Sequence, residues 1–301
     1  MTRTTHSDRP GKDGRISAVM VSYMTGPALM EAVRGIQRDP GIFELIIIDN
    51  GNPRIDRARI WEVASRTENV RLVQGHGNIG FAAACNYGAA LADGDYLLFI
   101  NPDAILESGA ARQMARAGDL HTRPWITGGM LFNAAGREQR GGRRGVLSMR
   151  SAIASFTPLH RLPGIASIHR ENEPLPSGPA LIPTVSGALM LMDRQSFDQL
   201  GGFDEAYFLH VEDIEICRRA RDMGGDVIFV PGACAFHYGS TSEVTRWRVE
   251  MHKLRGLIRY FWTSGPGFGA KLGTILIAPL MAAALMARTV WLSLRKAVTG
   301  R

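Results

Sequence analysis

Cysteine is scarce in this chain of 301 residues, and the few cysteines show no pairing pattern. Cys85, Cys217 and Cys234 are odd in number and have no CxxC spacing. This argues against a disulfide framework or a structural zinc site and favours a reducing compartment. Lysine is scarce as well, since only four of the 35 basic residues are lysines, so arginine dominates the net charge of +7. Arginine binds phosphate and carboxylate bidentately, which favours anionic partners, although a GC-rich genome would also produce this excess.

The chain also lacks a secretory signal and the composition of a fibrous or disordered protein. Residues 1–15 are polar and have no apolar core, so we expect a disordered arm there. With 45% hydrophobic and 21% charged residues, collagen-like, coiled-coil and wholly disordered classes are excluded. The arginines are scattered and no aromatic platform motif accompanies them, so we expect no nucleic-acid partner.

An uncharged, largely apolar run lies near the C-terminus, at 272–287. Its sixteen residues fall short of the roughly 20 that a membrane-crossing helix needs. Aromatic residues and cations lie near both of its ends, a combination that suits a membrane interface. We therefore predict a helical, membrane-associated region over 244–301, with a spanning helix and a buried helical hairpin as the alternatives.

Short apolar segments alternate with helical segments in the first third of the chain. We expect strands at 15–24, 43–49, 70–74 and 96–101, and helices at 26–37, 57–65 and 80–92. This alternation predicts βαβ units, and so a mostly parallel sheet with helices on both faces. Ligands of such sheets bind beyond the carboxyl ends of the strands, so polar residues at those ends are the first candidates for a site.

Residues 137–180 interrupt this pattern, because they are rich in Arg, Gly, Ser and Pro and only weakly periodic. We expect a long, partly mobile excursion, in which the Arg-Gly stretch 136–146 either clamps a diphosphate or forms a solvated loop. A second ordered half follows. In it we expect a strand at 184–194, a helix ending near residue 201, a helix within 206–223 and a pair of strands at 226–237.

Polar residues stand where several of these strands are expected to end. Asp49 follows the second strand, where a carboxylate either accepts a hydrogen bond from a base or ribose or caps a turn. Asn101 and Asp103 follow the fourth strand. A divalent ion that holds phosphates needs only one or two protein carboxylates, so Asp103 fits such a site. His237 follows an apolar strand and, as a neutral imidazole, would complete a metal site with Asp103, unless it is simply structural.

The stretch 201–221, GGFDEAYFLHVEDIEICRRAR, concentrates charge more than any other candidate. If Asp213 opens a helix, its carboxylate is held near the helix N-terminus and can take a proton from a hydroxyl. In the alternative interpretation, Glu212 and Asp213 only cap the helix, and the arginines after them, Arg218 among them, form a solvated face.

A glycine motif, GHGNIG at 75–80, matches the G-x-G-x-x-G pattern of dinucleotide-binding folds. It lies in the third βα unit, whereas that fingerprint belongs to the first. We therefore expect these glycines to serve a tight turn and close helix packing, and we keep a Rossmann oxidoreductase only as a minor alternative.

The order of the motifs is more specific than any one of them. VSY, IIIDNGN, NIGFAAACN, INPDA, SGALMLMDR, GGFDEAYFLHVEDIEICRR and HYGSTS follow one another along the chain. This order resembles family 2 glycosyltransferases of the GT-A fold, especially bacterial rhamnosyltransferase-like members that build surface polysaccharides. The resemblance implies an α/β GT-A catalytic domain over 16–243. Its nucleotide-binding half would be 16–104, and its acceptor and catalytic half 184–243.

The resemblance also implies roles on the donor side. Ser22 and Tyr23 would lie beside the base, and Asp49 would bind the nucleoside. Asp103 would hold the divalent ion, Mg²⁺ or Mn²⁺, that bridges the donor diphosphate. His237 would help to hold that ion or the diphosphate itself.

On the acceptor side, the resemblance makes Asp213 the general base, with Glu212 beside it. Gly187 would let a sugar approach closely, because it has no side chain. Three further residues of the same motifs are candidates for substrate binding: Asn78, Asn101 and Arg218.

The implied reaction is an inverting, metal-dependent sugar transfer from a dTDP- or UDP-linked donor to a lipid-linked or saccharide acceptor. The sugar would be rhamnose or another hexose, and the enzyme would lie on the cytoplasmic face of the plasma membrane. The chain departs from the family at Met24 and Cys85, where many members carry asparagine, and its metal motif is NPD rather than DxD. A non-catalytic scaffold with a glycosyltransferase fold is therefore the main alternative.

Overall fold

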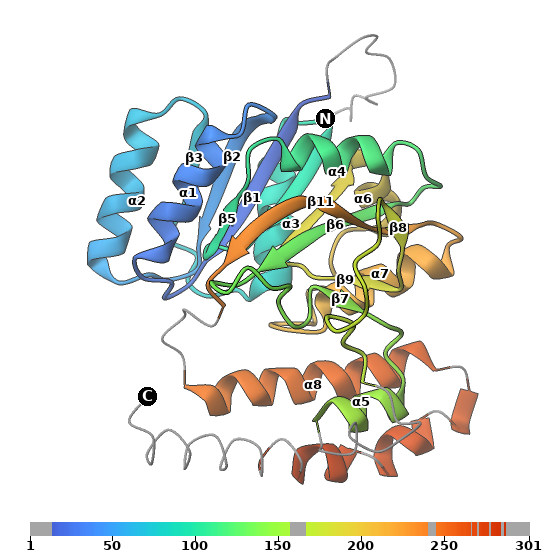
Figure 1. Cartoon of the computed structure of the whole chain (residues 1–301). Coiled ribbons are helices and arrows are strands. Elements are labelled where there is room, and N and C mark those ends of the chain that lie inside the picture. The colour runs from blue at the N-terminus through green and yellow to red at the C-terminus, as the bar shows by residue number, and fades with distance from the viewer. Residues whose placement is uncertain are drawn as a thin grey trace, which may run out of the picture.

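A computed structural model of the chain describes residues 14–156, 167–239, 245–265, 267–269, 271–276, 278–283 and 286. Its centre is a nine-stranded sheet with the order β3-β2-β1-β4-β10-β6-β11-β5, in which β8 pairs with β11 (Figure 1). The first four strands along the chain are β1 (Ile16–Ser22), β2 (Ile42–Asp49), β3 (Val70–Val73) and β4 (Tyr96–Ile100). The remaining strands are β5 (Ala104–Leu106), β6 (Ile126–Phe132), β8 (Ala180–Leu181), β10 (Leu189–Asp193) and β11 (Val227–His237).

The predicted mostly parallel sheet is confirmed. β1 pairs in parallel with both β2 and β4, β2 with β3, and β6 with β11. β10 lies between β4 and β6 and runs antiparallel to both. β1 is buried along its whole length, which agrees with its continuous apolar sequence, as expected for a strand covered on both faces.

Helices cover both faces of this sheet (Figure 1). On one face lie α1 (Ala28–Arg38), which contacts β2 and β5, and α4 (Ala110–Gly118), which contacts β6 and β11. On the other face lie α3 (Phe81–Leu91), α6 (Arg194–Leu200) and α7 (Glu212–Asp222). α2 (Arg54–Arg66) contacts β3. Small residues permit close packing: a Cβ on Gly88 of α3 would lie 2.4 Å from Cγ1 of Val19.

Where the structure describes it, the excursion predicted over 137–180 contains regular secondary structure. β7 (Arg143–Arg144) pairs antiparallel with β9 (Thr184–Val185), and α5 (Met149–Phe156) follows. A buried ion pair fixes this segment, because Arg143 donates from Nε and Nη2 to the two carboxylate oxygens of Glu138 at 2.8 and 2.7 Å. Residues 157–166 lie outside the described residues.

The expected pair of strands at 226–237 is one bent strand, β11. Its register against β6 shifts between Val230 and Cys234, where Pro231 lies. Proline has no backbone N–H to donate to the sheet, so a bulge at this point lets the strand continue.

A second hydrophobic core joins the segments on either side of residue 243. α8 (Arg246–Ser264) contributes Leu254, Leu257 and Tyr260, which pack with Tyr207 and Ile214 next to α7. Figure 1 shows α8 and α5 below the sheet. The expected boundary between a catalytic domain and a C-terminal region therefore runs through a shared core. Among the described residues, no helix has both the length and the apolar character needed to cross a bilayer.

At the other end of the chain, Arg15 joins the fold. Its N–H donates to Oδ2 of Asp95 at 3.1 Å, and its carbonyl accepts from the N–H groups of Asp95 and Tyr96. The ordered chain therefore includes Arg15, the last residue of the expected arm, while residues 1–13 lie outside the described part.

Candidate functional site

The carboxyl ends of the parallel strands collect most of the residues singled out from the sequence. Ser22 and Asp49 are the last residues of β1 and β2 and are partners in the register of these strands. Asn101 directly follows β4. His237 ends β11, paired in the register with Ala104, so it lies beside Asp103. This edge is where ligands bind in an open α/β sheet.

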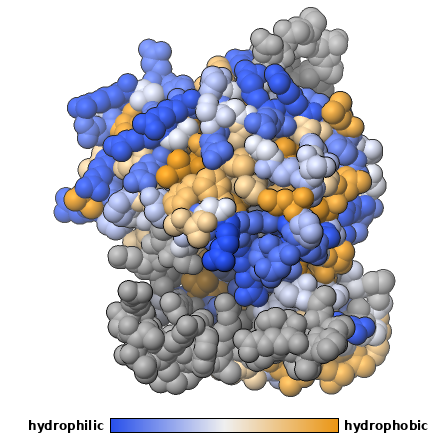
Figure 2. Space-filling model, viewed as in Figure 1, coloured by the Kyte–Doolittle hydropathy of each residue, from blue (hydrophilic) through white to orange (hydrophobic). Residues whose placement is uncertain are grey.

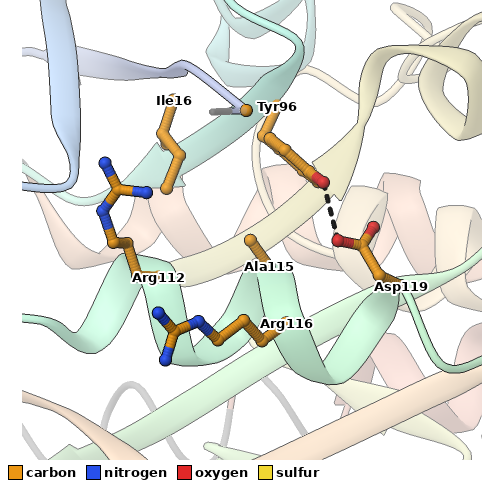
Figure 3. A pocket seen from close by; sticks show the side chains of 7 residues that line it. Ile16, Tyr96, Arg112, Ala115, Arg116 and Asp119 are labelled. Carbon is orange, nitrogen blue, oxygen red and sulfur yellow. Dashed lines mark hydrogen bonds between the residues drawn. The ribbon is translucent and has the colours of Figure 1, made fainter. Parts of the chain in front are cut away.

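The opposite, amino-terminal edge carries a separate pocket of about 110 Å³ (Figure 3). Ile16 and Tyr96, at the starts of β1 and β4, line it together with Arg112 and Arg116 of α4. The hydroxyl of Tyr96 donates to Oδ2 of Asp119 at 2.7 Å on its wall. None of the residues selected from the sequence lines this pocket, so it does not belong to the candidate site.

Asp49 is buried and held by the turn that follows it. Its Oδ1 accepts from the N–H groups of Gly51 and Asn52, both at 2.9 Å, and from Nδ2 of Asn52 at 2.8 Å. Nδ2 of Asn52 also donates to Oγ of Ser22 at 2.8 Å. Oδ2 of Asp49 accepts from Nε2 of Gln74 at 3.2 Å. Since Oδ1 is fully used, Oδ2 is the oxygen that can receive a donor from a ligand.

A second set of amides extends this network toward α3. Nδ2 of Asn50 donates to the carbonyl of Gly80 at 3.0 Å and lies 3.4 Å from Oδ1 of Asn78. The ring of Tyr23 lies over Gly51, where a Cβ would meet it at 3.5 Å. Ser22, Tyr23, Asp49 and Asn78 thus lie at the same end of the sheet. Nucleoside binding by the first three and substrate binding by Asn78 stay predictions.

The glycine of GHGNIG that precedes α3 serves close packing. Gly80 has φ +90°, and a Cβ there would lie 2.8 Å from the carbonyl oxygen of Phe208. The N–H of Phe81 donates to that same carbonyl at 2.7 Å. The motif therefore joins α3 to the segment before α7, which agrees with the packing role expected for it.

Asp103 and His237 form the clearest pair at this edge. Nε2 of His237 lies 3.0 Å from Oδ1 of Asp103 and 3.4 Å from Nδ2 of Asn101. Nδ1 of His237 hydrogen-bonds to Oε1 of Gln139, and an amide oxygen can only accept, so Nδ1 carries a proton. The carboxylate of Asp103 can likewise only accept, so in this structure Nε2 donates to it, and a metal ion bound to both atoms would take the place of that proton.

This donor set fits a divalent ion. A carboxylate oxygen and an imidazole nitrogen face one another, and Gln139 fixes the histidine tautomer, as outer hydrogen bonds do for metal-binding histidines. The described residues contain no group of three or more His, Cys, Asp or Glu side chains that could hold a metal. Asp103 and His237 would together supply two ligands, and phosphate oxygens and water would add to them.

Asp213 lies in the first turn of α7 and is held from three sides. Its Oδ2 accepts from Nη2 of Arg144 and, at 3.1 Å, from the N–H of Gly187. Its Oδ1 accepts from the N–H of Ile214 at 2.8 Å. Burial favours a higher pKa for Asp213, but the charge and hydrogen bond of Arg144 outweigh burial and hold that pKa below its usual range. Asp213 is therefore an ionised carboxylate at neutral pH.

Gly187 leaves one side of this carboxylate without a side chain. A Cβ on Gly187 would lie 3.3 Å from Cβ of Asp213 and 3.8 Å from its Oδ2. Any larger residue would extend further over the carboxylate. The geometry agrees with the expected role of Gly187 in leaving room for a sugar.

The pKa of Glu212, directly before Asp213, is shifted in the opposite direction. It is buried, and its Oε2 has no hydrogen-bond partner among the described residues. Burial and the negative charge of Asp213 raise the pKa of Glu212 to about 8. Neighbouring carboxyl groups are thus split into a neutral acid and an ionised base, a pattern common at catalytic sites.

The chain enters α7 through a strained turn. His210 has φ +67° and Val211 has φ +75°, a conformation that a β-branched residue rarely adopts. α8 packs against this turn, because a Cβ on Gly256 would lie 3.0 Å from the carbonyl oxygen of His210. Such strain costs on the order of 1–3 kcal/mol per residue and is most often found at functional sites.

Arg218 is the sequence-selected residue that the structure sets apart. It ion-pairs with Asp222 and Glu215 of its own helix, and its guanidinium lies 5.8 Å from the ring centre of Tyr260 on α8. Two contacts that the sequence did not reveal lie within the Arg-Gly segment: Gln139 on His237 and Arg144 on Asp213. From the sequence, that segment was expected to clamp a diphosphate or to form a solvated loop, without contacts to either of these residues.

Comparisons with known proteins agree with this geometry. The family model "Glycosyl transferase family 2" matches residues 17–201. The N-acetylglucosaminyl-diphospho-decaprenol L-rhamnosyltransferase of Mycobacterium tuberculosis is 26% identical over 246 residues, which cover 75% of this chain and 77% of the relative. The rhamnosyltransferase WbbL of Escherichia coli is 23% identical over 245 residues, covering 77% of this chain and 89% of the relative.

A solved structure supports the fold. The crystal structure of GalNAc-T7 with UDP, GalNAc and Mn²⁺ superposes with a TM-score of 0.60 at 16% identity. The match covers 83% of this chain and 51% of the other. Because the identity is low, the match supports the GT-A fold and nothing beyond it. Taken together, the family match over more than half of the chain and the carboxyl-edge site show that this protein belongs to glycosyl transferase family 2, whose members are inverting glycosyltransferases.

Proposed function

We propose that this glycosyltransferase moves a sugar, rhamnose or another hexose, from a dTDP- or UDP-linked donor to a lipid-linked sugar. The observation that carries this proposal is the ionised carboxylate of Asp213 beside the bare backbone of Gly187. The Asp103–His237 pair lies at the carboxyl edge of the same sheet. One group can activate a nucleophile, and the other can hold the leaving diphosphate.

The reaction that these residues support is a single displacement. Asp213 takes the proton of an acceptor hydroxyl, and that oxygen forms a bond to the anomeric carbon of the donor sugar. The bond from the anomeric carbon to the diphosphate oxygen breaks, and the nucleoside diphosphate leaves with that electron pair. One base and no covalent intermediate give inversion at the anomeric carbon.

Asp103 and His237 would hold Mg²⁺ or Mn²⁺ against the donor diphosphate, and Asn101 would stand beside them. When bound, the ion offsets the charge that grows on the leaving diphosphate. Gln139 keeps His237 in the tautomer that such binding needs. GalNAc-T7, which shares the fold, was crystallised with Mn²⁺.

The nucleoside would bind between β1, β2 and α3. Oδ2 of Asp49 is positioned to accept from the N–H of a pyrimidine base or from a ribose hydroxyl. The ring of Tyr23 and the side chains of Ser22 and Asn78 line the same end of the sheet.

A lipid-linked acceptor is supported by the relative from Mycobacterium tuberculosis, whose name specifies N-acetylglucosaminyl-diphospho-decaprenol. The segments after α8 expose large apolar side chains: Phe268 is 80% exposed, Leu276 65% and Leu280 64%. In Figure 2, apolar residues gather at the lower edge of the molecule, where Figure 1 draws these segments. We propose that they rest on the cytoplasmic face of the plasma membrane, where the enzyme would take part in building cell-surface polysaccharide.

The decisive experiment has two steps. Calorimetric titration with dTDP and with UDP, each with Mn²⁺ and with EDTA, is expected to show metal-dependent binding of one nucleotide. The corresponding dTDP-rhamnose or UDP-hexoses are then incubated with N-acetylglucosaminyl-diphospho-polyprenol, and glycosylated lipid is measured. A folded protein that binds neither nucleotide and transfers no sugar would contradict the proposal and favour the scaffold alternative.

A further inference from the structure

Donors already occupy the four usual hydrogen-bonding positions of the Asp213 carboxylate. A carboxylate offers about four lone-pair positions. Oδ1 receives the N–H of Ile214 and, at 3.4 Å, Nη1 of Arg144, while Oδ2 receives Nη2 of Arg144 and the N–H of Gly187. The two N–H groups belong to the backbone and cannot leave. Room for a substrate hydroxyl therefore opens most directly when the Arg144 side chain moves away from the carboxylate.

Arg144 cannot leave Asp213 without another anion. Its side chain is only 12% exposed, and its Nε is buried and donates to no group in the described part of the chain. A buried cation that loses its partner is strongly destabilised, so an incoming anion must replace the carboxylate. The unused Nε–H gives Arg144 a donor with which to bind that anion as a planar fork.

A second cation, Lys253 of α8, lies near enough to His210 for its charge to act on that histidine, as the charge of Arg144 also does. Gly256 of α8 packs against the backbone of His210, and Lys253 lies one helical turn earlier on the same face of α8. The ring of His252 stacks on Phe208 with 4.4 Å between centroids, which fixes this part of α8. Burial and the charge of Lys253 lower the pKa of His210 to about 3, so this histidine is neutral and adds no competing charge.

The anion that fits this place differs from the donor diphosphate. The donor diphosphate would lie at Asp103 and His237, which Gln139 contacts from the same Arg-Gly segment. The buried Arg143–Glu138 pair is adjacent in sequence to both Gln139 and Arg144 and gives the segment a rigid centre. The segment therefore contacts the metal pair through Gln139 and the base through Arg144. The acceptor is the substrate that must approach the base.

We propose that Arg144 is a positioning residue that exchanges Asp213 for the diphosphate of a sugar-diphospho-lipid acceptor, with Lys253 as the second cation of that site. This inference rests on the proposed transferase function. Before the acceptor binds, Arg144 keeps the carboxylate of Asp213 ionised and in a fixed orientation. When the guanidinium of Arg144 binds the acceptor diphosphate instead of Asp213, the carboxylate of Asp213 can receive the proton of the acceptor hydroxyl.

The test is calorimetric titration with inorganic pyrophosphate in EDTA, which removes the divalent ion that a donor site would require. Arg144→Gln and Lys253→Gln are each expected to weaken pyrophosphate binding about tenfold or more, the loss of a charge-assisted hydrogen bond. Asp213→Asn is expected to strengthen binding about tenfold, because it releases Arg144. The double variant Arg144→Gln/Asp213→Asn is expected not to show this strengthening of pyrophosphate binding.

Two control variants remove the same charges as Arg144→Gln and Asp213→Asn, one in the same Arg-Gly segment and one on the same helix. Arg140→Gln alters an arginine that is 53% exposed in the same segment, and Asp222→Asn alters a carboxylate that is 58% exposed on α7. Both are expected to leave pyrophosphate binding unchanged. Thermal melts accompany each variant, and Arg144→Lys is expected to retain part of the affinity in case Arg144→Gln fails to fold.

Further measurements separate the possible outcomes. Binding of UDP and dTDP with Mn²⁺ is expected to be unaltered by Arg144→Gln, whereas a large loss would assign Arg144 to the donor and overturn the proposal. Unchanged pyrophosphate binding in Asp213→Asn would also overturn it. A wild-type enzyme that transfers no sugar, yet shows this exchange, would contradict the proposed function alone. Normal transfer without the exchange would contradict only this inference.

Discussion

Asp103 and His237 are 134 positions apart in the chain, and Nε2 of His237 lies 3.0 Å from Oδ1 of Asp103. Asp103 follows β4, while His237 ends β11, and the antiparallel pairing of β5 with β11 sets them side by side. Oδ2 of Asp103 also accepts from the N–H of Gly239 at 3.1 Å, so both carboxylate oxygens are held by the end of β11 and the residues that follow it. The pair is therefore built into the sheet and does not depend on a mobile loop.

Asp103→Asn is expected to remove metal-dependent nucleotide binding. A neutral amide is a much weaker ligand for Mg²⁺ or Mn²⁺ than a carboxylate. Calorimetry with Mn²⁺ should show a large loss of affinity for the nucleotide that the wild type binds, and no change in EDTA. Asp93→Asn, at a carboxylate that is 60% exposed, is the matched control. Full Mn²⁺-dependent binding by Asp103→Asn would refute this assignment.

Gln139→Ala is expected to weaken the same site without touching a ligand. Loss of Oε1 frees the His237 ring to rotate and to change tautomer. Changes in such outer partners typically reduce metal affinity about 10- to 100-fold. The measurement is the Mn²⁺ concentration needed for half-maximal nucleotide binding, with the exposed Gln37→Ala as control. An unchanged requirement would show that Gln139 does not orient His237.

The fold was largely predictable because its strands are apolar runs separated by turn signals. β1 and β4 are continuous hydrophobic segments, and each is followed by polar residues where the sheet edge lies. Asp49, Asp103 and His237 are strand-end residues, so a prediction of strands already places them at one edge.

The contacts of the Arg-Gly segment were not predictable in the same way. Nothing in GREQRGGRRGV marks Arg143 as buried or Arg144 as the partner of Asp213, because all its arginines look alike in sequence. The pairing of β7 with β9 determines where Arg143 and Arg144 lie, because it places Arg144 opposite Thr184 and so close to Gly187. A two-residue strand has no periodicity that could signal such pairing.

Asp213→Asn is expected to lower the turnover number about 10²- to 10⁴-fold, the usual effect of losing a general base. Nucleotide binding should remain close to normal, because the substitution keeps the shape of the side chain and alters none of the residues expected to hold the nucleotide. Turnover and dTDP or UDP affinity are measured together, with Asp222→Asn as control. Wild-type turnover by Asp213→Asn would mean that another group accepts the proton.

Glu212 is expected to make folding stability depend on pH. Its folded-state pKa is raised from 4.5 to about 8, so the folded protein holds this proton more tightly than the unfolded chain. The stabilisation is complete below pH 4.5 and is lost as the pH rises through about 8. The charges that act on it are Asp213, which raises the pKa, and Arg144, which lowers it.

Glu212→Gln removes this titration, so its free energy of unfolding should fall less than that of the wild type between pH 5 and pH 9. Urea unfolding at both pH values measures the difference. Glu62→Gln, at an exposed residue of α2, should follow the wild type. Equal slopes for wild type and Glu212→Gln would show that Glu212 is ionised throughout this range.

Membrane contact is expected to depend on the exposed apolar residues after α8. Deleting the whole C-terminal region is a poor test, because α8 shares a core with Tyr207 and Ile214. Combined Phe268→Ser, Leu276→Ser and Leu280→Ser changes alter only exposed side chains. Together they remove an apolar contact worth on the order of several kcal/mol, so pelleting with vesicles of anionic and neutral phospholipid should be lost.

The matched control for these changes is the pair Leu120→Ser and Ile55→Ser, at side chains that are 86% and 62% exposed on the catalytic domain. These variants should pellet like the wild type, and all variants should bind nucleotide alike. The lysine and arginine residues of the chain predict stronger pelleting with anionic vesicles, weakening as salt screens the charges. If the triple variant pellets normally, the membrane contact lies on another surface. If the wild type does not pellet at all, the lipid-linked acceptor must be delivered without a stable membrane contact.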